Sequence, residues 1–80
     1  MLDDTSRKVL RVLWSLQRDA WAKADIERIA RMTVRTPGQV RAALRRLLNE
    51  QYIERHDESG LIRVLEGWDR AEAARFNGLR

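Results

Sequence analysis

The residues best suited to chemistry in this sequence are arginines, and six of them fall between Arg28 and Asn49. No aspartate or glutamate occurs in that stretch, so its formal charge is +6. The other 58 residues carry 10 basic and 12 acidic side chains, a net charge of −2, so this stretch accounts for the basic balance of the chain. Guanidinium groups bind phosphate and guanine edges in a bidentate manner. The distribution of charge therefore predicts a polyanionic partner.

Half of these arginines are expected on one helix whose start is strongly marked. In Thr36-Pro37-Gly38-Gln39 the threonine can cap the helix, the proline suits its first position, and the glutamine completes a capping box. The helix is predicted to run to about Gln51. At about 100° per residue, the side predicted to face the core carries Val40, Leu44, Leu47, Leu48 and Gln51. The side predicted to face outward carries Gly38, Ala42, Arg45 and Asn49, with Arg41 and Arg46 at its edges.

The outward side of this helix has the composition of a surface that enters the major groove of DNA. That groove, about 12 Å wide, admits one α-helix whose N-terminal residues reach base edges. The small residues Gly38 and Ala42 allow a close approach, and the N-terminus of the helix at Thr36 can hold a phosphate. The residues predicted to bind DNA are Arg28, Arg31, Arg35, Thr36, Gly38, Gln39, Arg41, Ala42, Arg45, Arg46, Asn49, Arg55 and Arg63.

Two helices are expected before this one. The first is predicted over about residues 6–20, with Asp4 or Thr5 as its N-cap. Its apolar stripe consists of Val9, Leu13, Leu16 and Ala20. After a break at 21–23, the second helix is predicted over residues 24–32, and its buried edge consists of Ile26, Ile29 and Ala30.

A β-hairpin and a last short helix are expected after it. The strand-like runs at 52–56 and 61–65 are joined by Asp57-Glu58-Ser59-Gly60, which is rich in turn formers. The last helix is predicted over about residues 69–77, because residues 69–72 have the spacing of a capping box and Asn77-Gly78 is a stop signal.

This order of elements is that of a winged helix-turn-helix domain, and residues 25–53 resemble the winged-helix DNA-binding domains of bacterial transcription regulators. The resemblance extends over about residues 7–66, and its matching motifs are Ile29-Ala30, Thr36-Pro37, the apolar residues Val40, Leu44 and Leu47, and Glu50-Gln51-Tyr52-Ile53. It implies one mainly α domain with three helices, a two-stranded wing and a short C-terminal helix. It also implies sequence-specific binding of double-stranded DNA by a small prokaryotic or phage transcription regulator.

Three positions depart from the family pattern. Val34 stands where the family has a glycine in the turn, and Arg35 follows where an apolar residue is usual. Gln51 replaces the usual glycine at the end of the capped helix. The geometry of the turn therefore stays open, and the outward aim of Arg35 is an assumption. The resemblance implies that Arg28 and Arg31 lie on the helix that crosses the DNA backbone.

Other interpretations of the charged residues stay open. An arginine-rich face can be a solvated surface with glutamate partners, and such partners lie four residues from Arg31 and from Arg46. Arg41 and Arg45 have no acidic residue three or four positions away. The acidic tip of the hairpin favours a hairpin that only covers the core over one that touches DNA. The alternative functions are a protein-interaction module that docks on an acidic surface and an RNA-binding module.

The rest of the composition narrows the class of protein. The 80 residues make one domain, and the absence of cysteine excludes disulfides and zinc thiolates. His56 is the sole histidine, and no metal site, cofactor or catalytic residue is predicted, so the chain is expected not to be an enzyme. Short apolar runs and an acidic start predict a cytoplasmic protein. One module gives a DNA footprint of only about 600–1,000 Å², so a homodimer through Trp68, Phe76 and Leu79 is a further expectation.

Overall fold

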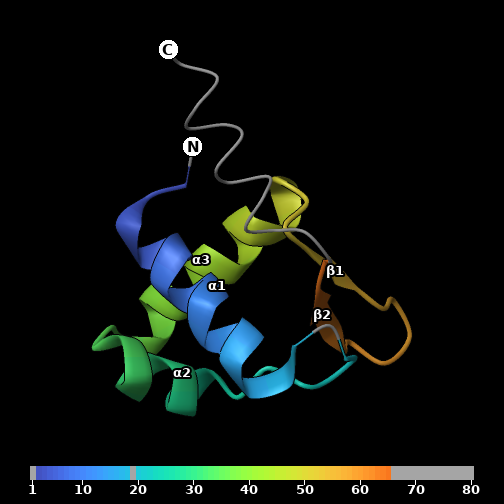
Figure 1. The fold of residues 1–80 in the computed structure, drawn as a ribbon, viewed down its shortest axis with the longest axis horizontal. Helices are drawn as coiled ribbons and strands as arrows, with labels where there is room; N and C mark the ends of the chain where they lie inside the picture. Colours follow the sequence, from blue (N-terminus) through green and yellow to red (C-terminus); the bar gives the residue numbers. More distant parts are fainter. Residues whose placement is uncertain (1, 19, 66–80) are drawn as a thin grey trace.

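The computed structural model describes residues 2–18 and 20–65, which form three helices followed by a β-hairpin. In chain order the elements are α1 (Asp4–Gln17), α2 (Ile26–Thr33), α3 (Pro37–Asn49), β1 (Ile53–Arg55) and β2 (Ile62–Val64) (Figure 1). The prediction of a mainly α chain with a β-hairpin is confirmed for these residues. The helix predicted at about 69–77 and the dimer surface predicted at Trp68, Phe76 and Leu79 lie outside the described residues. In the described part, no helix is long and apolar enough to cross a bilayer.

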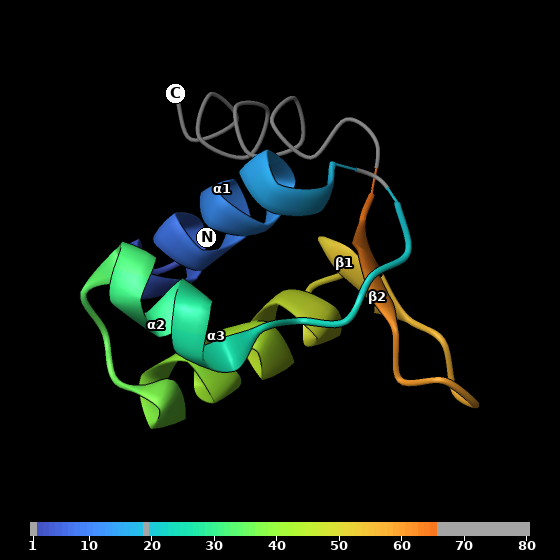
Figure 2. The same ribbon diagram turned by 90° about the horizontal axis from the view of Figure 1, so that it is seen from below.

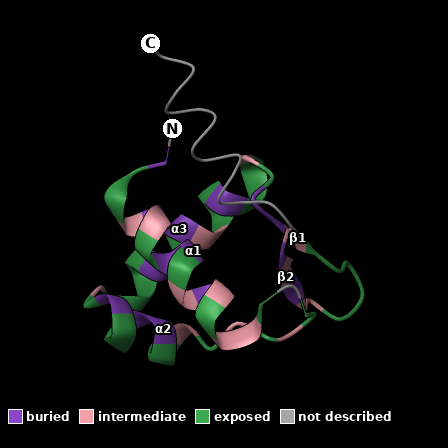
Figure 3. Ribbon diagram, viewed as in Figure 1, coloured by how far each residue is buried: buried purple, intermediate pink, exposed green. Residues whose placement is uncertain are grey.

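The core forms where the three helices meet, and the hairpin closes it. Each helix packs against the other two, while β1 packs on α3 and β2 packs on α1. Figure 3 shows buried segments on all three helices and on the hairpin. Val9, Leu10 and Leu13 of α1 and Leu47 of α3 are fully buried. Because burial of one such side chain stabilises a fold by about 1.5–3 kcal/mol, this core fixes α3 and leaves its opposite face outside.

The N-cap of α1 is one residue earlier than the sequence predicts. The carboxylate oxygen Oδ1 of Asp3 accepts a hydrogen bond from the Ser6 N–H at 3.0 Å, which satisfies one of the free donors of the first turn. The prediction of Asp4 or Thr5 as the cap is therefore wrong. All three consecutive residues suit an N-cap chemically, and the packed register of the helix selects among them.

The turn between α2 and α3 is built on a valine in the left-handed conformation. Val34 has φ 55° and ψ 48°. Its N–H donates to the Arg31 carbonyl at 3.4 Å, and the Arg35 N–H donates to the Ala30 carbonyl at 3.0 Å. These two bonds form a Schellman motif, whose left-handed position usually carries glycine. The turn thus has the geometry of a glycine turn, although its β-branched side chain is 83% exposed and gains little from burial.

Helix α3 begins as predicted. The Gln39 N–H donates to Thr36 Oγ1 at 3.1 Å and the Thr36 N–H donates to Gln39 Oε1 at 2.9 Å, so the capping box is confirmed. The residues of α3 that are buried in the core are Val40, Ala43 and Leu47. The buried side is therefore centred closer to Ala43 than predicted, and Leu48, expected on the core side, is 37% exposed.

The end of α3 repeats the geometry of the end of α2. The helix ends at Asn49, two residues before the predicted end, and the exposed Gln51 has φ 64°. The Tyr52 N–H donates to the Leu47 carbonyl at 2.9 Å, and the Gln51 N–H donates to the Leu48 carbonyl at 3.2 Å. This is a second Schellman motif without glycine. The prediction that Gln51 lies on the core side of the helix is wrong, because the chain reverses at this residue.

The hairpin follows its predicted pattern over shorter strands. The antiparallel register pairs Ile53 with Val64, Glu54 with Arg63 and Arg55 with Ile62. The turn closes through bonds from the His56 N–H to the Leu61 carbonyl and from the Gly60 N–H to the His56 carbonyl, both at 2.8 Å. Gly60 has φ 73°, a conformation that favours glycine.

Residues 21–23, predicted only as a break between two helices, pair with the hairpin through an isolated β-bridge. Ala22 and Ile62 exchange both backbone hydrogen bonds at 2.9 Å, so residues 20–25 run beside β2 (Figure 2). The Ile62 carbonyl also accepts from Nε2 of Gln17 at 2.8 Å, at the last residue of α1. Ala20, predicted to lie in the first helix, is exposed and follows its end. Helix α1 therefore ends at Gln17, the residue whose side chain bonds to the hairpin.

Candidate nucleic-acid interface

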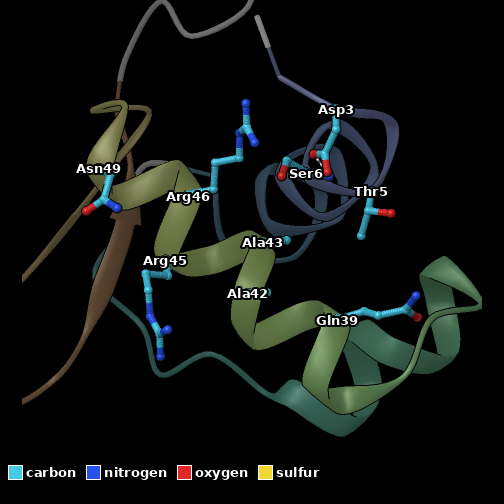
Figure 4. A pocket seen from close by; sticks show the side chains of 9 residues that line it. All are labelled: Asp3, Thr5, Ser6, Gln39, Ala42, Ala43, Arg45, Arg46 and Asn49. Atoms are coloured by element: carbon cyan, nitrogen blue, oxygen red, sulfur yellow. Dashed lines mark hydrogen bonds between the residues drawn. The ribbon is translucent and has the colours of Figure 1, made fainter.

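The outer face of α3 combines small residues with arginines, as predicted. Gly38 and Ala42 are exposed, and so are Arg41 and Arg45. Figure 4 shows Arg45 and Arg46 leaving the helix on opposite sides, with Ala42 one turn earlier, towards Gln39. A hollow of about 460 Å³ lies between this face and the start of α1, and it is lined by Asp3, Thr5, Ser6, Gln39, Ala42, Ala43, Arg45, Arg46 and Asn49. Asn49 is also exposed, so the predicted outward residues of α3 share one accessible side of the helix.

The positive charge of this face is largely uncompensated. Arg41 and Arg45 form no ion pair with any residue of the described segments, as their sequence neighbours predict. The same is true of Arg28 and Arg31 on α2, both exposed, so the four-residue spacing from Glu27 to Arg31 does not produce a pair here. Four guanidinium groups on α2 and α3 are thus available to an anion.

Arg46 is held by the glutamate that follows it by four residues. Its Nε lies 3.0 Å from Glu50 Oε2, so the pair that the sequence allows is formed. An exposed pair of this kind contributes about 0.3–0.5 kcal/mol. The loss of this one ion pair would therefore cost little.

Arg35 does not point outward, contrary to the assumption made from the sequence. Its Nε donates to Thr5 Oγ1 at 3.0 Å, and its Nη2 donates to Asp4 Oδ2 at 3.1 Å. Its Nη1 donates to the carbonyls of Val34 at 3.2 Å and Thr33 at 3.4 Å. The side chain is only 24% exposed. Arg35 therefore joins the turn to the first turn of α1, and its role is to position α3.

The start of α3 is accessible, and nothing in the described fold requires a glycine there. Thr36 and Gln39 are exposed but bond to each other in the capping box. A Cβ added at Gly38 would meet only Thr36 Oγ1, at 3.9 Å, which is an ordinary contact. The packing of the described residues thus gives no structural reason for glycine at position 38.

The two hairpin arginines differ in their surroundings. Arg63 pairs with Glu54 and lies over the Trp21 ring, 4.9 Å from its centroid. His56 contacts the same tryptophan: the ring centroids of His56 and Trp21 are 5.9 Å apart, and the rings meet edge-on. Arg63, Trp21 and His56 thus form a cluster. Arg55 is exposed and has no ion pair within the described residues. Of the two, only Arg55 is positioned as an open anion contact.

The cluster around Trp21 was not predicted. The sequence places Trp21 in a break between helices, and its neighbours are some forty residues away. The Ala22–Ile62 pairing brings it to the hairpin, where it stays 41% exposed. An isolated β-bridge between distant residues produces no periodic pattern in the sequence, so hydrophobic periodicity could not predict this cluster.

The carboxylate of Asp3 lies at the edge of the same surface. The Ser6 hydroxyl beside it, the Ser6 N–H and the charge of Arg46 lower the pKa of Asp3 from its ordinary value of 3.8. The buried Ser6 Oγ itself makes no hydrogen bond of good geometry within the described residues. Asp3 is therefore ionised at neutral pH and stabilises the first turn of α1.

The described residues hold no group of three His, Asp or Glu side chains that is close enough to bind a metal ion. Comparison with known proteins found no matching family model, no matching curated protein and no matching solved structure.

Proposed function

We propose that this chain is a winged helix-turn-helix domain that binds double-stranded DNA and acts as a small transcription regulator. The observation that carries the proposal is the outer face of α3, where Gly38 and Ala42 are exposed beside Arg41 and Arg45, two arginines that form no ion pair within the described part of the chain. In this function α3 lies in the major groove, with Arg41 and Arg45 donating to base edges or phosphates. The order of three helices and a hairpin supports the proposal.

The remaining residues divide by role. Arg28 and Arg31 on α2 and Arg55 at the end of β1 supply phosphate contacts, while Arg46 joins them when it leaves Glu50. Arg35 and the Thr36–Gln39 box set the angle of α3 rather than touch DNA through their side chains. The open backbone N–H groups at the start of α3 and its positive dipole end favour a phosphate there.

A salt titration of binding tests the proposal. Five of the arginines predicted to bind DNA have no ion pair among the described residues: Arg28, Arg31, Arg41, Arg45 and Arg55. If all five neutralise phosphates, a plot of the logarithm of the binding constant against the logarithm of salt concentration has a slope of about −4.5. Selection of bound duplexes from a random library gives the target sequence. Fluorescence anisotropy with that duplex, labelled and titrated at several salt concentrations, then gives the slope. The double variant R41A/R45A is expected to lower affinity for the selected duplex by at least about tenfold, since each good bidentate contact to a base edge contributes about 1–3 kcal/mol.

The single variants R41A and R45A are measured as well, and their matched control is R11A, because Arg11 is an exposed arginine of α1 outside this face. It changes the net charge by one unit and is expected to leave affinity nearly unchanged. Absence of duplex binding at low salt, or equal loss for R11A and for each α3 variant, would refute the proposal. Stronger competition by structured RNA than by duplex DNA would move the assignment to RNA.

A further inference from the structure

Strand β1 has one edge that no described strand covers. Ile62, the register partner of Arg55, directs its N–H and its carbonyl to Ala22 and so away from β1. In an antiparallel ladder, hydrogen-bonded pairs alternate with pairs whose backbone groups point outward. Ile53 and Arg55 therefore direct their backbone groups away from β2, and no backbone hydrogen bond to them occurs among residues 2–18 and 20–65.

An apolar hollow of about 460 Å³ lies beside this edge, between β1 and α3. Its apolar lining consists of Ala24, Leu44, Leu48, Ile53 and Ile62. A second hollow, of about 480 Å³, shares Leu48, Ile53 and Arg55 with the first, so the two follow β1 along its length. We call the hollow lined by Leu44, Arg45, Leu48, Ile53 and Arg55 the β1 groove; Ile53 is only 3% exposed and lines it from the core side.

The charge of the β1 groove selects its occupant. The first hollow has no acidic residue, and its two charged residues, Arg45 and Arg55, have no ion pair in the described structure. The second hollow also includes Glu54, but the charge of that carboxylate is compensated by its ion pair with Arg63. A second copy of the chain would bring the same two arginines against them. We therefore propose that the β1 groove binds an extended acidic segment of a partner protein, which adds to β1 as a further strand.

The pleat of the strand also predicts the order of side chains in that segment. Ile53 and Arg55 are two residues apart and so lie on the same face of β1. A strand added beside them presents an apolar and an acidic side chain two positions apart on that face. Arg45 belongs both to this groove and to the proposed DNA surface. If the proposed function holds, the acidic segment and DNA exclude each other.

Two synthetic peptides test the proposal without DNA. In both, Ile and Glu flank one Thr, in the order Ile-Thr-Glu or Glu-Thr-Ile, within an otherwise Ser/Thr sequence with blocked ends. Nuclear magnetic resonance titration of the full chain is expected to show binding of at least one peptide. The amide signals of Ile53 and Arg55 are expected to shift most, because these N–H groups form the new hydrogen bonds.

Control peptides separate strand addition from simple charge attraction. N-methylation of alternate amides is expected to abolish binding in one of the two registers and to spare the other. Replacement of Glu by Lys is expected to weaken binding by about tenfold, as is R55E, whereas R11E has little effect. Circular dichroism checks that each variant is folded.

Three results would overturn the proposal: no binding of either peptide at millimolar concentration, equal binding of both N-methylated peptides, or binding that survives the Glu-to-Lys exchange. Absence of peptide binding would overturn only this inference, because the DNA-binding measurements on the parent chain, R41A/R45A and R11A test the proposed function separately. A chain that binds these peptides but no duplex would refute the proposed function and keep this inference.

Discussion

Replacement of Val34 by glycine is expected to stabilise the protein. A left-handed conformation costs an L-residue about 1–2 kcal/mol, and Val34 adopts one at φ 55°. Glycine removes that cost but adds about 0.5–1 kcal/mol of backbone entropy lost on folding. Since the side chain is 83% exposed, little burial is lost. The net gain is about 0.5–1 kcal/mol, and for a domain of this size it raises Tm by about 2–8 °C.

Thermal unfolding followed by far-UV circular dichroism measures this gain. The matched control is V34A, which keeps a Cβ and hence most of the conformational cost, so its Tm is expected to stay near that of the parent chain. Q51G makes the same change at the end of α3, and its gain is expected to add to that of V34G because the two turns are separate. A fall in Tm for V34G, or an equal rise for V34A, would refute the reasoning.

Three further changes probe the site and its supports. G38A is expected to raise stability by about 0.4–1 kcal/mol, because the added Cβ meets only an ordinary contact, and to weaken duplex binding; equal or tighter binding would contradict a close approach at Gly38. R35M is expected to lower Tm more than R41M, since only the former loses bonds to α1; equal melting curves would show that Arg35 does not support the turn. Because the pKa of Asp3 is lowered in the folded chain, its carboxylate stabilises the fold above about pH 4, and that contribution is lost as pH falls further. D3A is therefore expected to cost about 1 kcal/mol at neutral pH, whereas D3N keeps the cap and flattens the acid dependence; urea titrations at several pH values measure both, and an unchanged acid profile for D3N would exclude Asp3 as its source.

Local signals account for what the sequence predicted well. The capping box at the start of α3 depends on residues three apart, and its partners are found in the structure as expected. The exposed arginines of α3 follow from helical spacing once that start is known. The fold class follows from the order of such signals, each of which acts within a few residues.

Long-range contacts account for what the sequence missed. Arg35 bonds to side chains some thirty positions earlier, so no local pattern reveals that it is held inward. The contacts of Trp21 and the open edge of the β1 groove both depend on the Ala22–Ile62 bridge, whose two residues are forty positions apart in the sequence. At Val34 the missing glycine suggested an altered turn, yet the hydrogen bonds impose a glycine-like geometry on valine. These bonds span at most five residues, so at this position local hydrogen bonding overrides residue preference.

The three backbone and side-chain bonds at Ile62 have a consequence for how the molecule opens. Because Ile62 is tied to Ala22 through both of its backbone groups and to Gln17 through its carbonyl, the hairpin cannot separate from the body without also releasing residues 20–25 and the last turn of α1. Native-state hydrogen exchange would register these segments as one cooperative unit with a common opening free energy. The tip at residues 57–60 lies beyond the hydrogen bond from the His56 N–H to the Leu61 carbonyl, so its fluctuations are expected to be independent of that unit.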